Sequence, residues 1–174
     1  MYKRQEYHSP QVEAFAGTAA TSLHAYTLTN TPEAIGIARA AERAGLPLAL
    51  SFTVETDGAL PGGKPLGVAI TEVDDATRGY PSYYMINCAH PRHFTRELRS
   101  GAPWVDRIGG LRANASTKSH AELDASPEID IGDITELAED HSELLPWLPN
   151  VQLIGGCCGT DHRHIAAICA RCLS

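Results

Sequence analysis

The sequence has no long hydrophobic run and no signal-like start. No segment of the 174-residue chain approaches the roughly 18 consecutive apolar residues that a membrane helix needs. The opening MYKRQEYHSP also lacks the apolar core of a signal peptide. We therefore expect no membrane association and a reducing, cytoplasmic location.

Clustered positive charge is also missing. The 14 Lys and Arg residues are scattered along the chain and are outnumbered by 21 Asp and Glu residues, which leaves a formal net charge of -7. Proteins that bind nucleic acid usually present a basic face to the phosphates. The composition therefore argues against nucleic acid as a partner.

Two nucleotide-binding motifs and a regular disulfide pattern are absent as well. No G-x-G-x-x-G follows the first predicted strand, and the glycine-rich 154-IGGCCGT-160 lacks the Lys of a phosphate-binding loop. Five cysteines are an odd number for a disulfide framework. In a reducing compartment, clustered cysteines more often bind metal or take part in catalysis.

What the chain does contain is a regular alternation of strand and helix patterns, in a composition that suits one globular domain. The predicted strands are residues 21–29, 47–54, 82–88, 108–116 and 151–156. The predicted helices are residues 32–45, 66–77, 91–100 and 161–173, and a further segment, 132–148, that is helical until Pro146. Strict alternation predicts an α/β fold with a parallel sheet, either doubly wound or part of a (β/α)₈ barrel. The missing nucleotide motifs favour the barrel.

Four polar residues fall at or just beyond the ends of predicted strands: Cys88, Asn114, Cys157 and Cys158. The carboxyl ends of parallel strands meet at one face of such a fold, so we expect these side chains to collect there. Three thiolates suit Zn²⁺ and leave a fourth position for a substrate atom. Glycines around the cysteine pair would allow the tight turn. Buried cysteines that act as small hydrophobic residues are the alternative, and the spacing leaves both possibilities open.

Three stretches, 84-YMINCAHP-91, 112-RANAS-116 and 154-IGGCCGTDHRHI-165, resemble the zinc-binding homocysteine S-methyltransferase family. The resemblance extends to 51-SFTVETDGALPGGKPL-66 and 33-EAIGIARAA-41 in the same order. It implies a (β/α)₈ barrel in which Cys88, Cys157 and Cys158 bind Zn²⁺. It also implies methyl transfer from a small-molecule donor to a thiol acceptor such as homocysteine, giving methionine.

The chain departs from the family pattern at one substrate position and in length. Tyr26 stands where relatives often have a Glu that holds the substrate amino group, so Tyr26 and Asn114 are the predicted substrate-binding residues. A (β/α)₈ barrel typically needs about 250 residues. We therefore expect residues 6–174 to form the C-terminal part of a homocysteine-binding barrel, about the last five strand–helix units, behind a non-native leader of residues 1–5. The open edges of such a partial sheet predict self-association.

Other residues carry weaker predictions. His120, His162 and His164 are candidates for groups around the metal ligands, and His90 or His93 for a fourth ligand. The segment 117–124 is expected either to reach the site or to form a solvated surface with a helix cap. We expect Cys169 and Cys172 to pack in the core and 136-ELAEDHSE-143 to form a solvated helix face.

The alternative function is a non-catalytic barrel fragment with reduced, buried cysteines and no metal. A zinc hydrolase fits less well because three thiolates weaken the Lewis acidity of the metal. A vicinal dithiol redox protein is the remaining possibility.

Overall fold

A single parallel sheet organises the protein. The computed structural model describes the backbone of residues 2–173 and the side chains of residues 6–173. The strands lie side by side in sequence order and all run parallel: β1 (Leu23–Leu28), β2 (Leu48–Phe52), β3 (Tyr83–Asn87), β4 (Ile108–Ala113) and β5 (Leu153–Gly156). The predicted α/β class with five parallel strands is confirmed.

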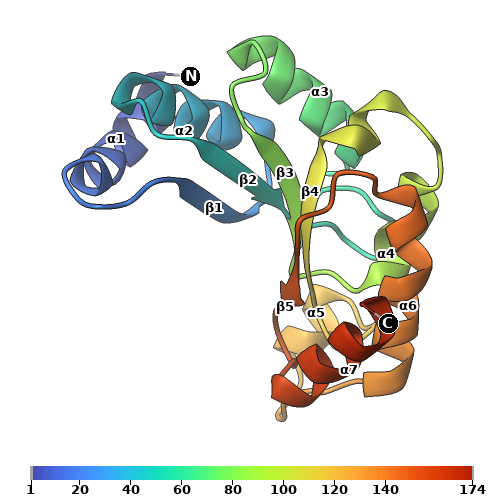
Figure 1. Ribbon diagram of the computed structural model, residues 1–174. Helices are drawn as coiled ribbons and strands as arrows, with labels where there is room; N and C mark the ends of the chain where they lie inside the picture. Colours follow the sequence, from blue (N-terminus) through green and yellow to red (C-terminus); the bar gives the residue numbers. More distant parts are fainter. Residues whose placement is uncertain (1, 174) are drawn as a thin grey trace.

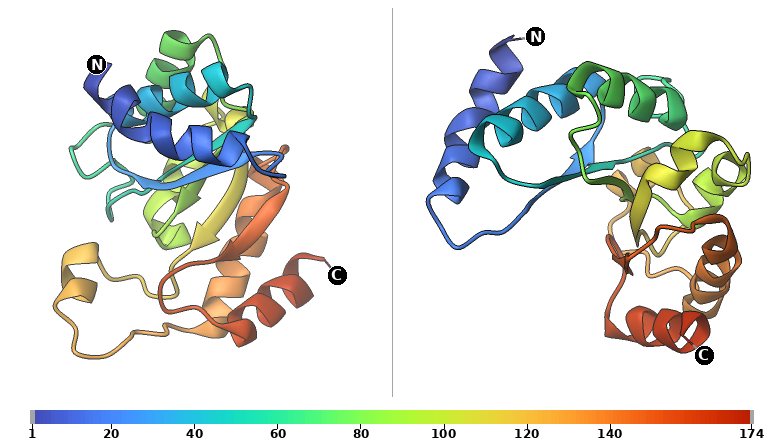
Figure 2. Two further views of the ribbon diagram at one scale, coloured as in Figure 1. Left: turned by 90° about the vertical axis from the view of Figure 1, so that its left-hand side faces the viewer. Right: turned by 45° about the horizontal axis from the view of Figure 1, so that its top comes forward.

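Helices follow the strands and cover one face of the sheet. They are α1 (Tyr2–Ala16), α2 (Thr31–Ala44), α3 (Leu66–Thr77), α4 (Pro91–Leu98), α5 (His120–Asp124), α6 (Ile134–Leu144) and α7 (His162–Cys172), with 3₁₀ turns at Pro103–Arg107 and Leu145–Trp147. Figure 1 shows the longer helices along the outer side of the curved sheet. In Figure 2 the elements follow one another around an arc, with the two termini at opposite ends.

The main core lies between the outer face of the sheet and helices α2, α3 and α4, with Leu144 at the end of α6. Every residue of β2 is buried, as expected for a strand in the middle of a parallel sheet. The largest side chains of this core belong to the outward-facing positions of the strands, among them Leu50, Phe52, Tyr84 and Ile86. The opposite, concave face carries smaller and more polar groups such as Ser51 and Asn87, which hydrogen-bond to each other.

Local signals in the sequence explain where helices begin and end. The side chain of Asn30 accepts a hydrogen bond from the Glu33 backbone at the start of α2, and Gly45 ends that helix in the left-handed conformation. Asp161 and His164 form a reciprocal cap at the start of α7. This cap positions α7 directly behind the cysteine pair.

The outer strands of the sheet are open. Within the part of the chain that the structure describes, β1 pairs only with β2, and β5 only with β4. No helix among the described residues is long and apolar enough to cross a membrane.

Several details differ from the sequence-based expectations. The helix predicted to run from residue 132 until Pro146 spans Ile134–Leu144, and a 3₁₀ turn that contains Pro146 follows it. Helices α1 and α5 were not predicted. The proposed leader, residues 1–5, lies outside the residues whose side chains are described. Its boundary with residues 6–174 stays a prediction.

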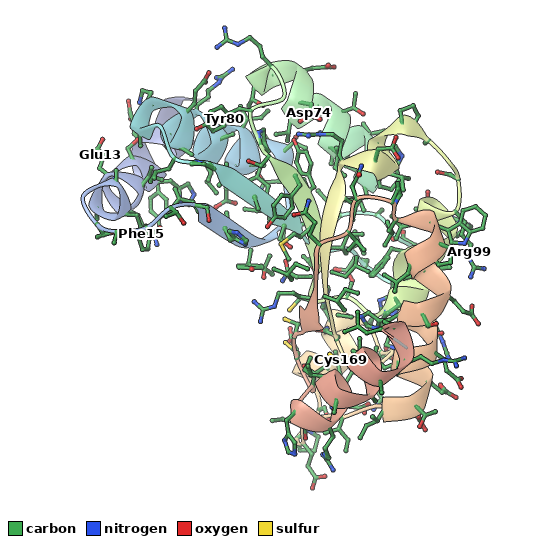
Figure 3. The ribbon with its side chains drawn as sticks, in the orientation of Figure 1. Glu13, Phe15, Asp74, Tyr80, Arg99 and Cys169 are labelled. Atoms are coloured by element: carbon green, nitrogen blue, oxygen red, sulfur yellow. The ribbon has the colours of Figure 1, made fainter. Side chains whose placement is uncertain are left out.

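The expectation that Cys169 packs in the core is wrong. Cys169 is exposed, on the side of α7 that no other element covers, and Figure 3 labels its place on that helix. Cys172, one turn further along, is partly buried against a small cluster that includes Leu137 and Ile168. The buried face of α7 is therefore the one directed toward α6 and the last strands of the sheet. The solvated face predicted for residues 136–143 is confirmed, because Glu136, Glu139 and Glu143 are exposed.

Candidate metal centre

Three cysteine sulfurs meet at the carboxyl end of the sheet. Cys88 follows β3 directly, and Cys157 and Cys158 follow β5. The sulfur of Cys88 lies 3.0 Å from that of Cys157 and 3.5 Å from that of Cys158. All three sulfurs lie within 4.8 Å of one another, and no other possible metal-ligand group of this kind is present among the described residues. The predicted convergence of the two segments is confirmed.

Backbone hydrogen bonds hold both cysteine segments to β4, which lies between them. The Cys88 amide donates to the Arg112 carbonyl at 3.1 Å, and the Cys157 amide donates to the Ala113 carbonyl at 2.7 Å. Cys88 has a φ of 56°, a left-handed conformation that is uncommon for a residue with a side chain. This conformation ends β3 and is part of the geometry that brings the Cys88 sulfur to the cysteine pair.

Asn114 joins the two segments through its side chain. Its amide nitrogen donates to the Cys88 carbonyl at 3.0 Å, and its amide oxygen accepts from the Cys158 backbone at 3.1 Å. Only 3% of Asn114 is exposed, so these bonds are shielded from water. Its amide thus connects the Cys88 and Cys158 segments through one donated and one accepted hydrogen bond, whereas direct substrate binding by Asn114 stays a prediction.

Close contacts leave no room for a side chain at two glycines next to the cysteine pair. A Cβ at Gly159, where φ is 77°, would lie 2.2 Å from the Asp130 carbonyl oxygen. At Gly156 it would lie 2.0 Å from the Thr160 hydroxyl oxygen. A side chain at either position would displace the turn that carries Cys157 and Cys158.

The three thiols cannot all lose their protons without a cation. A hydrogen bond from Cys88 lowers the pKa of Cys157 to about 5, against the opposing effect of burial. The same hydrogen bond, together with burial, raises the pKa of Cys88 far above its usual range. Two neighbouring thiolates repel each other, so ionisation of one disfavours ionisation of the next. A divalent cation would remove this conflict.

The donor set fits zinc. Three sulfurs bound tetrahedrally at about 2.3 Å from Zn²⁺ would lie roughly 3.8 Å apart, close to the separations between these cysteines. The cysteines are also accessible, since Cys88 and Cys157 are partly exposed and Cys158 is exposed. Cys88 and Cys158 line a pocket of about 400 Å³ that α5 and residues 126–130 close on one side. The sulfurs therefore face a space large enough for a small substrate, which argues against buried cysteines in a purely packing role.

His120 is the predicted histidine that reaches the metal centre. Its Nε2 lies 2.6 Å from the Cys88 carbonyl oxygen, and its Nδ1 lies 3.2 Å from a Glu55 carboxylate oxygen. Burial opposes protonation, but these two partners together raise the pKa of His120. It contacts the backbone of a ligand residue rather than a sulfur. Helix α5, with a Ser119–Glu122 capping box, positions it, so the segment 117–124 both reaches the site and forms a capped helix.

The other predicted histidines lie away from the sulfurs. His90 is buried and accepts from the Arg92 backbone at the start of α4, while His93 contacts the Thr117 carbonyl. His164 caps α7 and contacts the Ile131 carbonyl. His162 is exposed. The structure brings none of the four into the cysteine cluster, so His90 and His93 are not a fourth ligand in this geometry.

Tyr26 lies within β1, and its hydroxyl is 3.3 Å from His24 Nδ1. The Arg112 guanidinium lies over its ring, with 5.1 Å from the guanidinium carbon to the ring centre. A role for Tyr26 in substrate binding stays a prediction. Sequence reasoning missed Arg112 and also Asn87, whose side chain contributes to lowering the pKa of Cys157. The position of Asn87 directly before Cys88 was the available signal.

Comparison with known proteins decides the family. The family model described as "Homocysteine S-methyltransferase" matches residues 2–172. The chain belongs to the homocysteine S-methyltransferase family. It is 30% identical over 146 residues to methionine synthase of Mycobacterium tuberculosis (strain ATCC 25618 / H37Rv), a match that covers 78% of this chain and 11% of that protein.

The fold also matches a solved member of the family. The crystal structure of the homocysteine methyltransferase MmuM from Escherichia coli, in its apo form, superposes with a TM-score of 0.65 at 24% identity. The match covers 97% of this chain and 56% of that one. At this identity the likeness shows the fold, and the five parallel strands correspond to part of the MmuM barrel. The chain thus spans little more than half of the solved relative and about a tenth of the methionine synthase.

Proposed function

We propose that Cys88, Cys157 and Cys158 bind Zn²⁺ and that this protein takes part in methyl transfer to a thiol such as homocysteine, giving methionine. The observation that carries the proposal is the convergence of the three sulfurs beside an accessible pocket. Membership of the homocysteine S-methyltransferase family supports the same chemistry. The reaction belongs to the methyltransferase class.

Bound Zn²⁺ would keep a coordinated substrate thiol deprotonated at neutral pH and so make it nucleophilic. The protein's own residues supply the geometry. Asn114 fixes the carbonyl of Cys88 and the amide of Cys158, and His120 makes a second contact with the Cys88 carbonyl. Groups that orient metal ligands in this way strengthen metal binding.

The pocket beside the sulfurs would hold the reactants in register. Its walls include apolar side chains from Leu123, Pro127 and Ile129 and the polar groups of Ser116 and His120. Positioning of two reactants can supply a large part of a rate enhancement. The proposed partners are a small thiol acceptor and a small-molecule methyl donor, and the proposed location is the cytoplasm.

The first test is the zinc content of the purified protein, measured by elemental mass spectrometry. We expect about one zinc per chain, as for a three-thiolate site, and loss of that zinc in Cys157→Ser. Cys169→Ser is the matched control, because Cys169 is exposed on α7 and outside the cluster. It should retain the metal.

A folded parent protein without zinc would contradict the proposal. It would instead support the alternative of a non-catalytic barrel fragment with reduced cysteines. If zinc is present, transfer of an isotopically labelled methyl group to homocysteine, tested with sulfonium, ammonium and folate donors, measures the activity itself.

A further inference from the structure

An arginine on the concave face of the sheet has no acidic partner among the residues whose side chains the structure describes. Arg112 lies on β4, in register with Asn87 of β3 and Gly155 of β5. Residues paired in this way point to the same face of a sheet. Asn87 hydrogen-bonds to Ser51 on the concave face, so the Arg112 side chain also lies on that face of the sheet.

The path of the Arg112 side chain is well defined. It crosses Gly155, where an added Cβ would lie 3.6 Å from the Arg112 Cγ. Its Nε then donates to the Gly156 carbonyl at 3.2 Å, one residue before Cys157. The guanidinium lies over the Tyr26 ring. The charged end is therefore held between the last strand and the first, close to the turn that carries the cysteine pair.

Most of the donors of this guanidinium are available. A guanidinium has five N–H groups, of which the Nε–H is used here. Within residues 6–173, whose side chains the structure describes, no carboxylate forms an ion pair with Arg112. By contrast Arg107, on the same strand-and-turn segment, forms an ion pair with Asp74 on the outer face. A partly buried cation with free donors is a ready partner for an anion.

The charge around the Arg112 guanidinium also affects which acceptor molecules can bind. With Tyr26 at this position, the guanidinium is stacked on a neutral ring, and no carboxylate among the described residues pairs with it. The local field thus favours a negatively charged group on the ligand.

We infer that Arg112 binds the carboxylate of the thiol acceptor and makes this site selective for anionic thiols. The inference rests on the proposed function, because it assumes that the acceptor sulfur lies at the three cysteines. A guanidinium can hold a carboxylate by two parallel hydrogen bonds, which fixes the orientation as well as the charge of the ligand. Arg112 is then a specificity-determining residue, and Tyr26 is the platform that orients it.

The test compares three thiols on the zinc-containing protein by isothermal titration calorimetry: 3-mercaptopropionate, neutral 2-mercaptoethanol and cationic cysteamine. We expect the parent to bind the carboxylate thiol roughly tenfold to a hundredfold more tightly than the neutral one, the range for a charge-assisted hydrogen bond. Cysteamine should bind most weakly.

The matched variants are Arg112→Met, Arg112→Lys and, as a control, Arg96→Met, since Arg96 lies on the surface and pairs with Glu97. Arg112→Met should reduce the ratio of the 3-mercaptopropionate affinity to the 2-mercaptoethanol affinity to about one, measured on protein of known zinc content. Arg112→Lys should give an intermediate preference, because it keeps the charge but loses the two-pronged geometry.

The two hypotheses fail in different ways. A parent that contains zinc but binds all three thiols equally, or an Arg112→Met variant that keeps the full preference, would overturn the role of Arg112 alone. A parent that lacks zinc or binds no thiol would overturn the proposed function, and the assignment to Arg112 would fall with it.

Discussion

At the residue scale, Asn114 joins the two chain segments that carry the proposed metal ligands. Its side chain contacts the backbones of Cys88 and Cys158, which are far apart in the sequence. Its role is structural in the sense that it orients ligands, and it does so from a buried position. Removing such a group leaves the ligands present but free to move.

We predict that Asn114→Ala lowers zinc affinity by roughly tenfold to a hundredfold, the usual effect of losing an orienting partner of metal ligands. Competition with a chromogenic chelator measures the affinity. Asn150→Ala is the control, because the Asn150 side chain also donates to a backbone carbonyl, that of Asp106, but away from the cysteines. Equal affinity in the two variants would contradict the role assigned to Asn114.

His141 makes stability depend on pH. Burial lowers its pKa, although the Leu137 carbonyl and Asp140 favour the charged form. Within the described residues its Nε2 is buried without a hydrogen-bond partner, so a proton there would be poorly solvated. The unfolded chain binds this proton at higher pH than the folded protein does. The contribution of neutral, buried His141 to the free energy of unfolding is therefore complete above the unfolded pKa of about 6.5. It is lost as the pH falls below that value.

We predict that the free energy of unfolding decreases between pH 7 and pH 5, with this group contributing at most about 1.4 kcal/mol per pH unit. Urea unfolding at several pH values measures the slope. His141→Gln cannot titrate and should show a smaller slope, whereas His162→Gln, at an exposed position, should behave as the parent does. A slope unchanged in His141→Gln would refute the explanation.

At the scale of elements, the turn after β5 is constrained by the segment that follows β4. Gly159 approaches the Asp130 carbonyl so closely that no Cβ fits without movement. Residues 126–130 also line the pocket. A displacement of the turn with the cysteine pair would therefore also displace the wall of the pocket.

We predict that Gly159→Ala destabilises the protein more than Gly79→Ala does and weakens zinc binding as well. Both glycines have positive φ, 77° and 69°, so both variants share a strain of about 1–2 kcal/mol. Only Gly159→Ala adds a clash, since nothing lies within 4 Å of a Cβ at Gly79. Chemical unfolding measures the stability of both variants, and chelator competition measures their zinc affinity. Equal stability and equal zinc affinity in the two variants would disprove the coupling.

The sequence predicts the elements whose signals are local. Unbroken apolar runs such as 48–52 identify strands in the middle of the sheet, and the strand ends locate the cysteines. The sequence also contains a start signal for helix α5, because Ser119 and Glu122 form a capping box, but the helix has only five residues. Helix α1 contains Pro10 and depends on its packing against α2, which no local pattern reveals.

The same limit applies to the site. The three cysteines could be placed together because parallel strands end on one face. The contact between Arg112 and Tyr26 joins β4 and β1, which are not neighbours in the sheet, and it depends on the curvature of the whole sheet. Periodicity contains no information about that curvature. The exposure of Cys169 likewise depends on which neighbours cover α7.

At the scale of the whole molecule, the outer strands β1 and β5 each have one edge without a partner strand among the described residues. Beside β5, Val151, Ile154 and Ile165 line an apolar groove of about 390 Å³ that runs along α7. Leu173, at the end of the same groove, is 82% exposed. Unpaired strands and exposed apolar surface both favour association with another chain.

We predict that the protein self-associates in a concentration-dependent way, detectable by sedimentation velocity. Ile165→Glu, which places a charge in the groove beside β5, should weaken the association. Val68→Glu is the control, since Val68 is 54% exposed on α3, away from both sheet edges. A monodisperse monomer at all concentrations would argue against association through the edges.

The separation of the cysteines along the chain gives the metal centre a second consequence. Cys88 and Cys157 are 69 positions apart, and the intervening chain contains β4 and helices α4 to α6. An ion held by both would act as a cross-link, comparable to a disulfide that closes a loop of the same length and restricts the unfolded chain by roughly 4 kcal/mol. Metal loading and folding of the C-terminal half would then be thermodynamically linked, so the supply of zinc in the cell would also control how long this chain survives.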